Sequence, residues 1–281
     1  MDFSVLMTTY NGETPENLDA SLNSILIEQT VIPNQLVLVL DGPISDELKA
    51  VIDKYKQQFS DIVDVVDCPI NQGQSKASAE GMKHIKYDLV ARMDSDDICV
   101  KNRFELQLKV FEQNPNLSVV GGWIEEFNEN PGDLQSLRIV PEDHDSITKM
   151  FRNRTPINNV TAMIKKDAIE NAGGYGRPTV NEDYSLYAHM WVNNETFYNI
   201  QSVLVNVRVG NGMVSRRSDF KIFKDWCEDQ KYLYKNKKHS FFVSLFSCIK
   251  CFIFVITPVK LKDFLYKKFL RKGKKDDKKG V

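Results

Sequence analysis

The amino-acid sequence predicts an α/β fold in which a mostly parallel sheet is flanked by helices. Short apolar, β-branched runs alternate with segments of helical periodicity along residues 1–115, and each apolar run ends at a turn or at acidic residues. This alternation is typical of strand–helix units whose strands lie parallel in one sheet. The 281-residue chain is 42% hydrophobic and 27% charged, which excludes disordered, collagen-like and disulfide-scaffold proteins.

Four strands are expected in this first part of the chain. They lie at Phe3–Thr8, Leu36–Leu40, Ile62–Val66 and Leu89–Met93. Helices are expected to begin at Thr14–Pro15, after Ser45 and after the turn 71–74. Ligands of parallel sheets bind at the carboxyl ends of the strands, so we expect the residues that follow these strands to form the site.

Residues 116–236 follow a less regular pattern, which we interpret as the second half of the same domain. Strand-like runs lie at 118–127, 137–140, 161–165 and 203–209, and helices are expected over 143–151 and 183–192. We expect this half to hold the second substrate.

Carboxylates, and no phosphate-binding glycine motif, follow the strands. The chain has no G-x-G-x-x-G after its first strand and no G-x-x-x-x-G-K-[ST] segment, which disfavours dinucleotide oxidoreductases and P-loop NTPases. Asp41 follows the second strand, and Asp94 and Asp96 follow the fourth. Such carboxylates suit a Mn²⁺ or Mg²⁺ ion that bridges the protein to a diphosphate. Alternatively, residues 94–97 cap a helix that begins near Val100.

A second acidic pair, Glu182–Asp183, precedes a segment of helical periodicity. A carboxylate there could be a general base that removes a proton from an attacking hydroxyl group. Alternatively, the two residues only favour the start of the helix through its dipole.

In combination, these motifs resemble those of the family 2 glycosyltransferases, which are inverting enzymes of the GT-A fold. The resemblance runs from Phe3 to about Arg217. Its motifs are, in chain order, Val5–Asn11, Val39–Gly42, Asn71-x-Gly73, Met93–Asp97, Gly173–Tyr175, Glu182–Leu186 and Arg208. The resemblance implies that residues 1–115 bind a nucleotide-sugar and that residues 116–236 bind the acceptor.

The resemblance also implies roles for single residues of the donor site. Thr8, Tyr10 and Asp41 would hold the base and ribose, with Asp41 accepting a hydrogen bond from a uracil N–H, and Lys76 is near enough to help. Asp94 would lie close to the ribose and the metal, and Asp96 would ligate the Mn²⁺ or Mg²⁺ ion.

The catalytic base implied by the resemblance is Asp183, or else Glu182, for one in-line displacement that inverts the anomeric carbon. Two departures from the family pattern stand out. Asn159 lies where many relatives have His, which leaves the acceptor contacts open, and Gly42–Pro43 alters the turn after Asp41. Arg208 and the pair Arg216–Arg217 could reach a diphosphate or an acidic acceptor, or could be ordinary surface arginines.

The C-terminal residues 237–281 differ from the rest in charge. They hold 13 Lys and Arg against 3 Asp, so the segment carries +10 and the rest of the chain carries -11. Residues 240–259 are strongly apolar but contain Lys250, and residues 260–272 alternate lysines with apolar side chains at helical spacing. Residues 237–281 are therefore predicted to form a helical tail, which associates with an anionic membrane surface through residues 240–281. Whether residues 240–259 span or lie on the membrane stays open, as does the alternative of a core helix with a solvated tail.

The sequence thus predicts a metal-dependent inverting transferase of hexose from a nucleotide-sugar, with UDP as the expected nucleotide. The expected acceptor is a lipid-linked saccharide of capsular or exopolysaccharide synthesis, at the cytoplasmic face of the cell membrane. Nucleic acid is not an expected partner, because the body has few basic residues and no readout motif. The alternative is a non-catalytic module that binds nucleotide-sugar or glycan at the membrane. A sugar-nucleotide pyrophosphorylase would need a glycine-rich basic loop after the first strand, which Thr8–Glu13 lacks.

Overall fold

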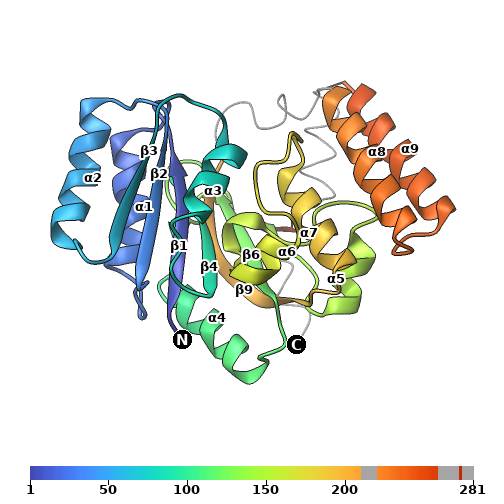
Figure 1. Cartoon of the computed structure of the whole chain (residues 1–281), viewed down its shortest axis with the longest axis horizontal. Helices are drawn as coiled ribbons and strands as arrows, with labels where there is room; N and C mark the ends of the chain where they lie inside the picture. Colours follow the sequence, from blue (N-terminus) through green and yellow to red (C-terminus); the bar gives the residue numbers. More distant parts are fainter. Residues whose placement is uncertain (210–219, 259–271, 274–281) are drawn as a thin grey trace.

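A mixed sheet forms the centre of the molecule and brings distant parts of the chain together (Figure 1). The computed structural model describes residues 1–209, 220–258 and 272–273. The main path of the sheet is β10-β7-β6-β8-β4-β1-β2-β3, and β9 pairs with β6 and β5. The strands are β1 (Phe3–Thr9), β2 (Gln35–Asp41), β3 (Val63–Cys68), β4 (Leu89–Asp94), β5 (Ile98–Cys99), β6 (Val119–Phe127), β7 (Ser136–Arg138), β8 (Met163–Lys165), β9 (Phe197–Arg208) and β10 (Lys272–Gly273).

The first half of the sheet is parallel, as the sequence predicts. β1 pairs in parallel with β2 on one side and with β4 on the other, and β2 pairs in parallel with β3. In this register Thr8 of β1 lies level with Val39 of β2 and with Asp94 of β4. The carboxyl ends of these strands therefore meet at one edge, where α/β sheets bind their ligands.

The second half of the sheet is mixed. β8 lies antiparallel to both β4 and β6, whereas β9 runs parallel to β6. β9 begins at Phe197, earlier than the run at 203–209 predicts, and register shifts interrupt its pairing with β6 on both sides of Trp123. These irregularities explain why the sequence pattern of this half is weak.

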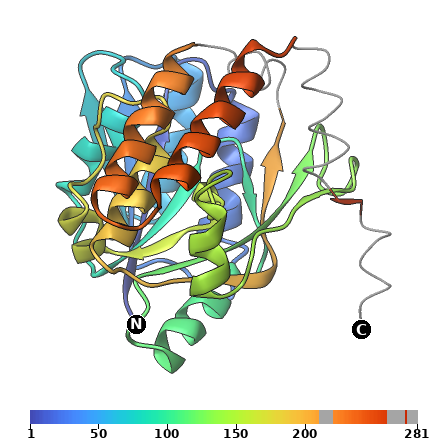
Figure 2. The same ribbon diagram turned by 90° about the vertical axis from the view of Figure 1, so that its right-hand side faces the viewer.

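Helices cover both faces of the sheet (Figures 1 and 2). α1, α2 and α4 pack on one face, and α3, α5, α6 and α7 pack on the other. Thr14 and Ser45 cap α1 and α2, as predicted. The bounds are α1 (Pro15–Leu26), α2 (Asp46–Gln58), α3 (Gln74–Met82), α4 (Arg103–Gln113), α5 (His144–Met150), the 3₁₀ turn η1 (Asn159–Thr161), α6 (Lys166–Asn171) and α7 (Glu182–Val192).

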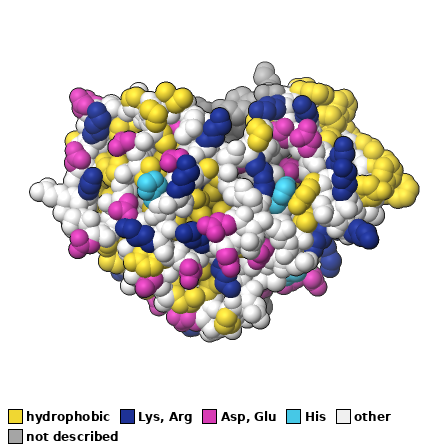
Figure 3. Space-filling model, viewed as in Figure 1, with side chains coloured by type: hydrophobic (Ala, Val, Ile, Leu, Met, Phe, Trp, Pro, Cys, Tyr) yellow, Lys and Arg dark blue, Asp and Glu magenta, His cyan; other side chains and the backbone are white. Residues whose placement is uncertain are grey.

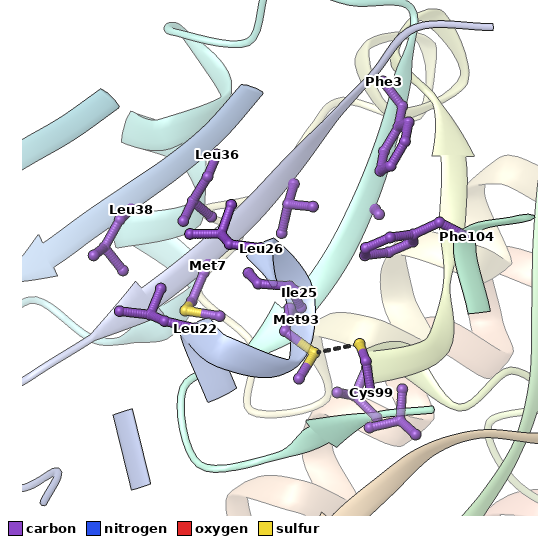
Figure 4. Packing of buried hydrophobic residues seen from close by; sticks show 14 of the residues in the cluster. Phe3, Met7, Leu22, Ile25, Leu26, Leu36, Leu38, Met93, Cys99 and Phe104 are labelled. Atoms are coloured by element: carbon purple, nitrogen blue, oxygen red, sulfur yellow. Dashed lines mark hydrogen bonds between the residues drawn. The ribbon is translucent and has the colours of Figure 1, made fainter. Parts of the chain in front are cut away.

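Under α1 and α4, apolar side chains fill the space between helices and sheet (Figure 4). The rings of Phe3 on β1 and Phe104 on α4 are 4.8 Å apart between centroids, and neither is exposed. Beside them the thiol of Cys99 lies 3.4 Å from the sulfur of Met93. This core fixes β1 and β4, whose ends carry the candidate site.

Two further helices, α8 (Phe220–Lys235) and α9 (Phe241–Ile256), lie side by side at one end of the molecule (Figure 2). The helix predicted within residues 240–259 is α9, whereas α8 was not predicted. None of the helices in the described ranges has both the length and the apolar composition needed to cross a bilayer. Most of the basic segment 260–272 lies outside the described residues, and Lys272 belongs to β10, which pairs with β7.

Helix α9 turns its small polar side chains toward the protein and its large apolar side chains outward. Ser244 and Ser247 are buried; the Ser244 hydroxyl donates to the Gln230 carbonyl, and the Trp226 indole donates to Ser247. The outward residues form an apolar surface at the right-hand edge of Figure 3. We define this apolar face of α9 as Phe241, Phe242, Leu245, Phe246, Ile249, Phe252, Ile253 and Ile256, all of which are exposed.

Replacement of Phe104 by Ala should lower the free energy of unfolding by about 3–5 kcal/mol, because a buried aromatic ring would leave a cavity between α4 and β1. Denaturant unfolding of both proteins measures this difference. The exposed Ile32 is the control, since Ile32→Ala should change stability by about 0.5 kcal/mol or less. An equal effect of the two substitutions would contradict the core described above.

Candidate active site

A cleft of about 570 Å³ opens at the carboxyl edge of β1, β2 and β4. It brings together Thr8, Tyr10, Asp41, Asp94 and Asp96, as expected for residues that follow these strands. The ends of β1 and β9, the loops after the strands and the first turns of α1 and α3 supply the other lining residues, which are Thr9, Gly12, Glu13, Thr14, Asn17, Asn71, Gly73, Gln74, Ser95 and Arg208.

Asp41 is buried at the end of β2, where the turn before α3 holds it. Its two carboxylate oxygens accept hydrogen bonds from the backbone N–H groups of Gln72 (2.8 Å) and Gly73 (2.9 Å). Gly42 has a φ of +89°, and a Cβ there would lie 2.6 Å from the backbone nitrogen of Asn71. A glycine therefore lets the two turns meet behind the carboxylate.

Negative charge accumulates at the end of β4. Burial, and then the charges of Asp94 and Glu13, raise the pKa of Asp96 to about 6. Burial raises the pKa of Asp94 as well, against the opposing charge of Arg92. Burial and the two neighbouring carboxylates raise the pKa of Asp97 well above its ordinary value. The free energy of this edge would therefore fall if a cation bound there.

Arg208, at the end of β9, makes two hydrogen bonds to the turn that carries these carboxylates. Its backbone N–H donates to Asp97 Oδ1 at 2.8 Å, and its Nε donates to the carbonyl oxygen of Asp96 at 3.2 Å. The guanidinium group lies 4.6 Å from the centroid of the Phe127 ring. Arg208 thus presents a positive charge to the cleft, whereas the pair 216–217 lies outside the described residues.

The interpretation of residues 94–97 as a helix cap is wrong. α4 begins at Arg103, its N-cap is Asn102, and strand β5 lies between the acidic residues and the helix. Asp94 and Asp96 instead face the cleft, where surplus negative charge fits a Mn²⁺ or Mg²⁺ ion. Such ions take one or two carboxylates and complete their shell with phosphate or water oxygens. Within the described residues, no three His, Cys, Asp or Glu side chains cluster as a metal site.

Glu182 and Asp183 form the first turn of α7 and lie beside the cleft, outside its lining. The charge of Asp183 raises the pKa of Asp94, so the two carboxylates lie close enough to interact. Burial raises the pKa of Glu182, against a hydrogen bond from Ser75 and the charge of Arg92. Asp183 Oδ1 also accepts the backbone N–H of Tyr184 at 2.7 Å, so its position at the start of the helix is compatible with both interpretations.

Some residues of the site differ from the sequence-based expectation. Lys76 is exposed on α3 and is absent from the lining of the cleft, so its role in donor binding stays a prediction. Asn159, where many relatives have His, accepts a hydrogen bond from the Tyr187 hydroxyl at 2.8 Å. Glu13 and Gln74 line the cleft although no sequence pattern singled them out. For Gln74 the signal was its place directly after the Asn71-x-Gly73 motif.

The family assignment follows from comparison with known proteins. The family described as "Glycosyl transferase family 2" matches residues 4–177. This chain belongs to the family 2 glycosyltransferases. Like other members it is an enzyme, and Asp41, Asp94 and Asp96 all lie within the matched residues.

Two relatives of this glycosyltransferase are similar over almost their whole length. The amylovoran biosynthesis glycosyltransferase AmsE of Erwinia amylovora is 35% identical over 276 residues, which cover 96% of this chain and 100% of AmsE. The UDP-Gal:alpha-D-GlcNAc-diphosphoundecaprenol beta-1,3-galactosyltransferase of Escherichia coli is 33% identical over 272 residues, which cover 96% of this chain and 97% of that enzyme.

A solved structure confirms the GT-A fold of the glycosyltransferase. S. aureus TarS 1-349 in complex with UDP-GlcNAc aligns with a TM-score of 0.66 and 16% sequence identity, covering 96% of this chain and 77% of that chain. At this identity the likeness concerns the fold.

Helix α8 supports the loop that leads into Glu182 and Asp183. Asp225 Oδ2 accepts the backbone N–H of Val180 at 2.8 Å, and the Asn181 side chain donates to the Ile222 carbonyl at 3.1 Å. Asp229 is buried on the same helix, and one of its carboxylate oxygens makes no hydrogen bond among the described residues. Burial is the main cause that raises the pKa of Asp229 to about 7.

Asp229→Asn should stabilise the glycosyltransferase by about 2–4 kcal/mol above pH 7, because ionised Asp229 is costly in the folded state and not in the unfolded chain. Because the pKa of Asp229 is higher in the folded protein than in the unfolded chain, its ionisation destabilises the folded state. The gain is complete above pH 7, shrinks as the pH falls from 7, and vanishes below about pH 4, the ordinary value for an unfolded Asp. Thermal unfolding from pH 4 to 8 measures it, with the exposed Asp61→Asn as the control. A gain that does not depend on pH would contradict the assignment.

Proposed function

We propose that this glycosyltransferase moves a hexose from a UDP-sugar to a lipid-linked saccharide with inversion of the anomeric carbon. The observation that carries the proposal is the convergence of Asp41, Asp94 and Asp96 on one cleft, with Asp183 beside Asp94. Asp41 lies at the end of β2, and Asp94 and Asp96 lie at and just after the end of β4, so their meeting is a property of the fold.

The donor site follows from the lining of the cleft. Thr8, Tyr10 and Asp41 line the cleft and would hold the base and ribose, and the remaining lone pairs of Asp41 could accept a uracil N–H. Asp94 and Asp96 would hold a Mn²⁺ or Mg²⁺ ion, which stabilises the leaving nucleoside diphosphate when bound. Arg208 would add a second positive charge on the diphosphate.

The base for the acceptor hydroxyl is one of the two carboxylates at the start of α7. Asp183 is our choice, because the resemblance to the family implies a base at this position; both Asp183 and Glu182 interact electrostatically with Asp94. It would take the proton of the attacking hydroxyl as the bond to the anomeric carbon forms and the bond to the diphosphate breaks. Glu182 remains the second candidate for the same step.

The acceptor is proposed from the relatives. One acts on GlcNAc linked to diphosphoundecaprenol, and another belongs to amylovoran biosynthesis, according to their names. We therefore propose a lipid-linked saccharide of cell-surface polysaccharide synthesis, taken up at the cytoplasmic face of the membrane.

The apolar face of α9 is the proposed membrane contact. It exposes 67% of Phe242 and 54% of Ile253, and contiguous apolar surfaces of this kind mark interaction sites. A lipid bilayer is the occupant that we propose, since the chain continues from α9 into the lysine-rich residues 260–281, which suit anionic headgroups. Helix α9 would lie in the plane of the interface, as apolar helices with a basic flank do.

Asp183→Asn should lower kcat by about 10²–10⁴-fold and leave UDP binding intact, because a general base contributes about that factor to the chemical step. Asp96→Asn should instead weaken Mn²⁺-dependent UDP binding. UDP release with a membrane acceptor and calorimetric titration of UDP measure the two effects. The exposed Asp61→Asn is the matched control, and undiminished turnover in both variants would refute the assigned roles.

The triple variant Phe242→Ser, Phe246→Ser and Ile253→Ser should lose vesicle binding by at least about tenfold, because each buried apolar side chain contributes about 1.5–3 kcal/mol. Co-sedimentation with vesicles that contain phosphatidylglycerol measures it. Ile32→Ser, an exposed change far from α9, should not alter binding, and both proteins should still bind UDP. Full vesicle binding by the triple variant, or by a chain lacking residues 240–281, would overturn the proposed contact.

A further inference from the structure

Glu13 is an acidic residue of the cleft that lies outside the motifs described above. It follows β1 in the loop before α1, and it lines the cleft together with Ser95 and Asp96. Its side chain is partly buried, and both of its carboxylate oxygens accept hydrogen bonds from the protein. The two oxygens bond to different elements, so Glu13 connects parts of the site that are distant in the sequence.

The Oε1 atom of Glu13 holds the start of α1. It accepts the backbone N–H of Thr14 at 2.8 Å and a side-chain N–H of Asn17 at 3.1 Å. Thr14 is the N-cap of α1, and its hydroxyl oxygen accepts the backbone N–H of Asn17 at 3.2 Å. The first N–H groups of a helix lack partners within the helix, so contacts of this kind stabilise its start. Oε1 therefore has a structural task.

The Oε2 atom of Glu13 bonds to a different part of the site. It accepts the hydroxyl proton of Ser95, with 3.1 Å between the two oxygens. Ser95 is 6% exposed and lies between Asp94 and Asp96 in the turn after β4. A serine hydroxyl has one proton to donate, and the bond to Glu13 uses it. The loop after β1 is thus tied to the middle of the acidic turn, 82 residues further along the chain.

The acidic turn after β4 is held at three points. Ser21 of α1 donates to the carbonyl oxygen of Asp94 at 3.0 Å, and Arg208 Nε donates to that of Asp96 at 3.2 Å. Glu13 holds the side chain of the residue between them. Mg²⁺ demands near-octahedral geometry and short bonds to oxygen, so two carboxylates bind it together only when their spacing is right. The bond to Glu13 therefore lies where it can control that spacing.

A carboxylate at residue 13 is costly unless a cation binds nearby. Its charge adds to those of Asp94 and Asp96 in the same cleft, and like charges repel more strongly where water is excluded. This charge is one of the causes that raise the pKa of Asp96. The amide oxygen of a glutamine could accept the same bonds at the start of α1 without this repulsion. A role in holding α1 alone therefore does not account for the charge of Glu13.

We propose that Glu13 is a positioning residue with one task for each carboxylate oxygen. Oε1 fixes the start of α1, and Oε2 holds Ser95 so that Asp94 and Asp96 keep the spacing that a Mn²⁺ or Mg²⁺ ion needs. This inference rests on the proposed function, because it assumes that these two aspartates hold the metal. It adds to the metal site a residue from the loop after β1, and it gives the middle residue of Asp94-Ser95-Asp96 a task.

Ser95→Ala removes the bond to Oε2 and leaves both carboxylates of the turn in place. The apparent Kd for Mn²⁺, measured by calorimetric titration in the presence of UDP, should rise about tenfold, the order of effect expected when a partner that orients a metal ligand is lost. At saturating Mn²⁺, kcat should fall less than about threefold, because Ser95 takes no part in proton transfer. The exposed Ser60→Ala is the matched control. An unchanged Kd for Mn²⁺ in Ser95→Ala would overturn the role of Glu13.

Asn17→Ala tests the other oxygen, because it removes a donor to Oε1 and leaves the bond to Ser95 intact. It should lower the melting temperature of the metal-free protein by about 2–4 °C, as expected for one lost contact at a helix start, and leave the Kd for Mn²⁺ within about twofold. Ser95→Ala should change the melting temperature less than Asn17→Ala does. Equal weakening of Mn²⁺ binding by the two substitutions would show that Glu13 acts only through α1, and the division of tasks would be wrong.

A double-mutant cycle tests whether Glu13 and Ser95 act together. Glu13→Ala should raise the Kd for Mn²⁺ at least as much as Ser95→Ala does, since it also removes a negative charge. Addition of Ser95→Ala to Glu13→Ala should cause no further rise, because the bond is already absent. The exposed Glu16→Ala, on the same helix, is the control for the loss of a charge. Effects that multiply in the double variant would mean that the two residues act separately and would contradict the proposal.

One further variant separates this inference from the proposed function. If the unsubstituted protein binds Mn²⁺ with UDP and Asp96→Asn loses this binding, the proposed metal site stands, and the Glu13, Asn17 and Ser95 variants alone decide the inference. If Asp96→Asn binds Mn²⁺ as tightly as the unsubstituted protein, the proposed metal site is wrong and the inference fails with it.

Discussion

Carboxylates packed at the end of β4 repel one another more strongly as water is excluded, so this edge of the sheet must be held by other contacts. The Ser21 hydroxyl fastens the backbone carbonyl of Asp94 from α1 at 3.0 Å, and Arg208 fastens Asp96 and Asp97 from β9. Hydrogen bonds from α1 and β9 thus hold the acidic residues 94–97 in place. After burial, the remaining repulsion contributes to the raised pKa values of Asp96 and Asp97, and a bound cation would relieve it.

Both halves of the sheet contribute residues to this edge. The parallel half brings strand ends from distant parts of the sequence to one edge, and the mixed half returns β9 and α7 to the same edge. α8 then braces the loop before α7 through Asp225 and Ile222. The carboxylates proposed for the donor site and the carboxylates proposed as the base therefore meet at one place, although they belong to separate parts of the chain.

The sequence predicted those features that depend on local pattern. The first four strands and three helices have strong periodicity, and the turn and acidic residues that end the strands identified Asp41, Asp94 and Asp96. β9 was underestimated because its pairing with β6 is irregular around Trp123, and the short α6 spans too few residues to show a period. The hydrogen bonds of Gln74 with Asp94 and of Ser75 with the backbone of Gly176 join residues that are 20 and 101 positions apart, which no local pattern contains. The positive charge of residues 237–281 predicted that this segment contacts a membrane. That the large apolar side chains of α9 face away from the protein could be seen only in the structure.

Helix α9 buries small polar side chains and exposes large apolar ones, and this arrangement affects which substitutions it can accept during evolution. Ser244 and Ser247 fit against α8 and the Arg152 carbonyl, so these positions accept only small side chains. Most of the outward positions are exposed, and Phe, Leu or Ile would serve there equally well; the exceptions are Phe241 and Phe252, whose rings contact Tyr234 and Phe223 of α8. Drift should therefore be slow on the serine side and rapid, within apolar limits, on the other. Conservation would then be inverted relative to an ordinary surface helix, whose apolar side is the constrained one.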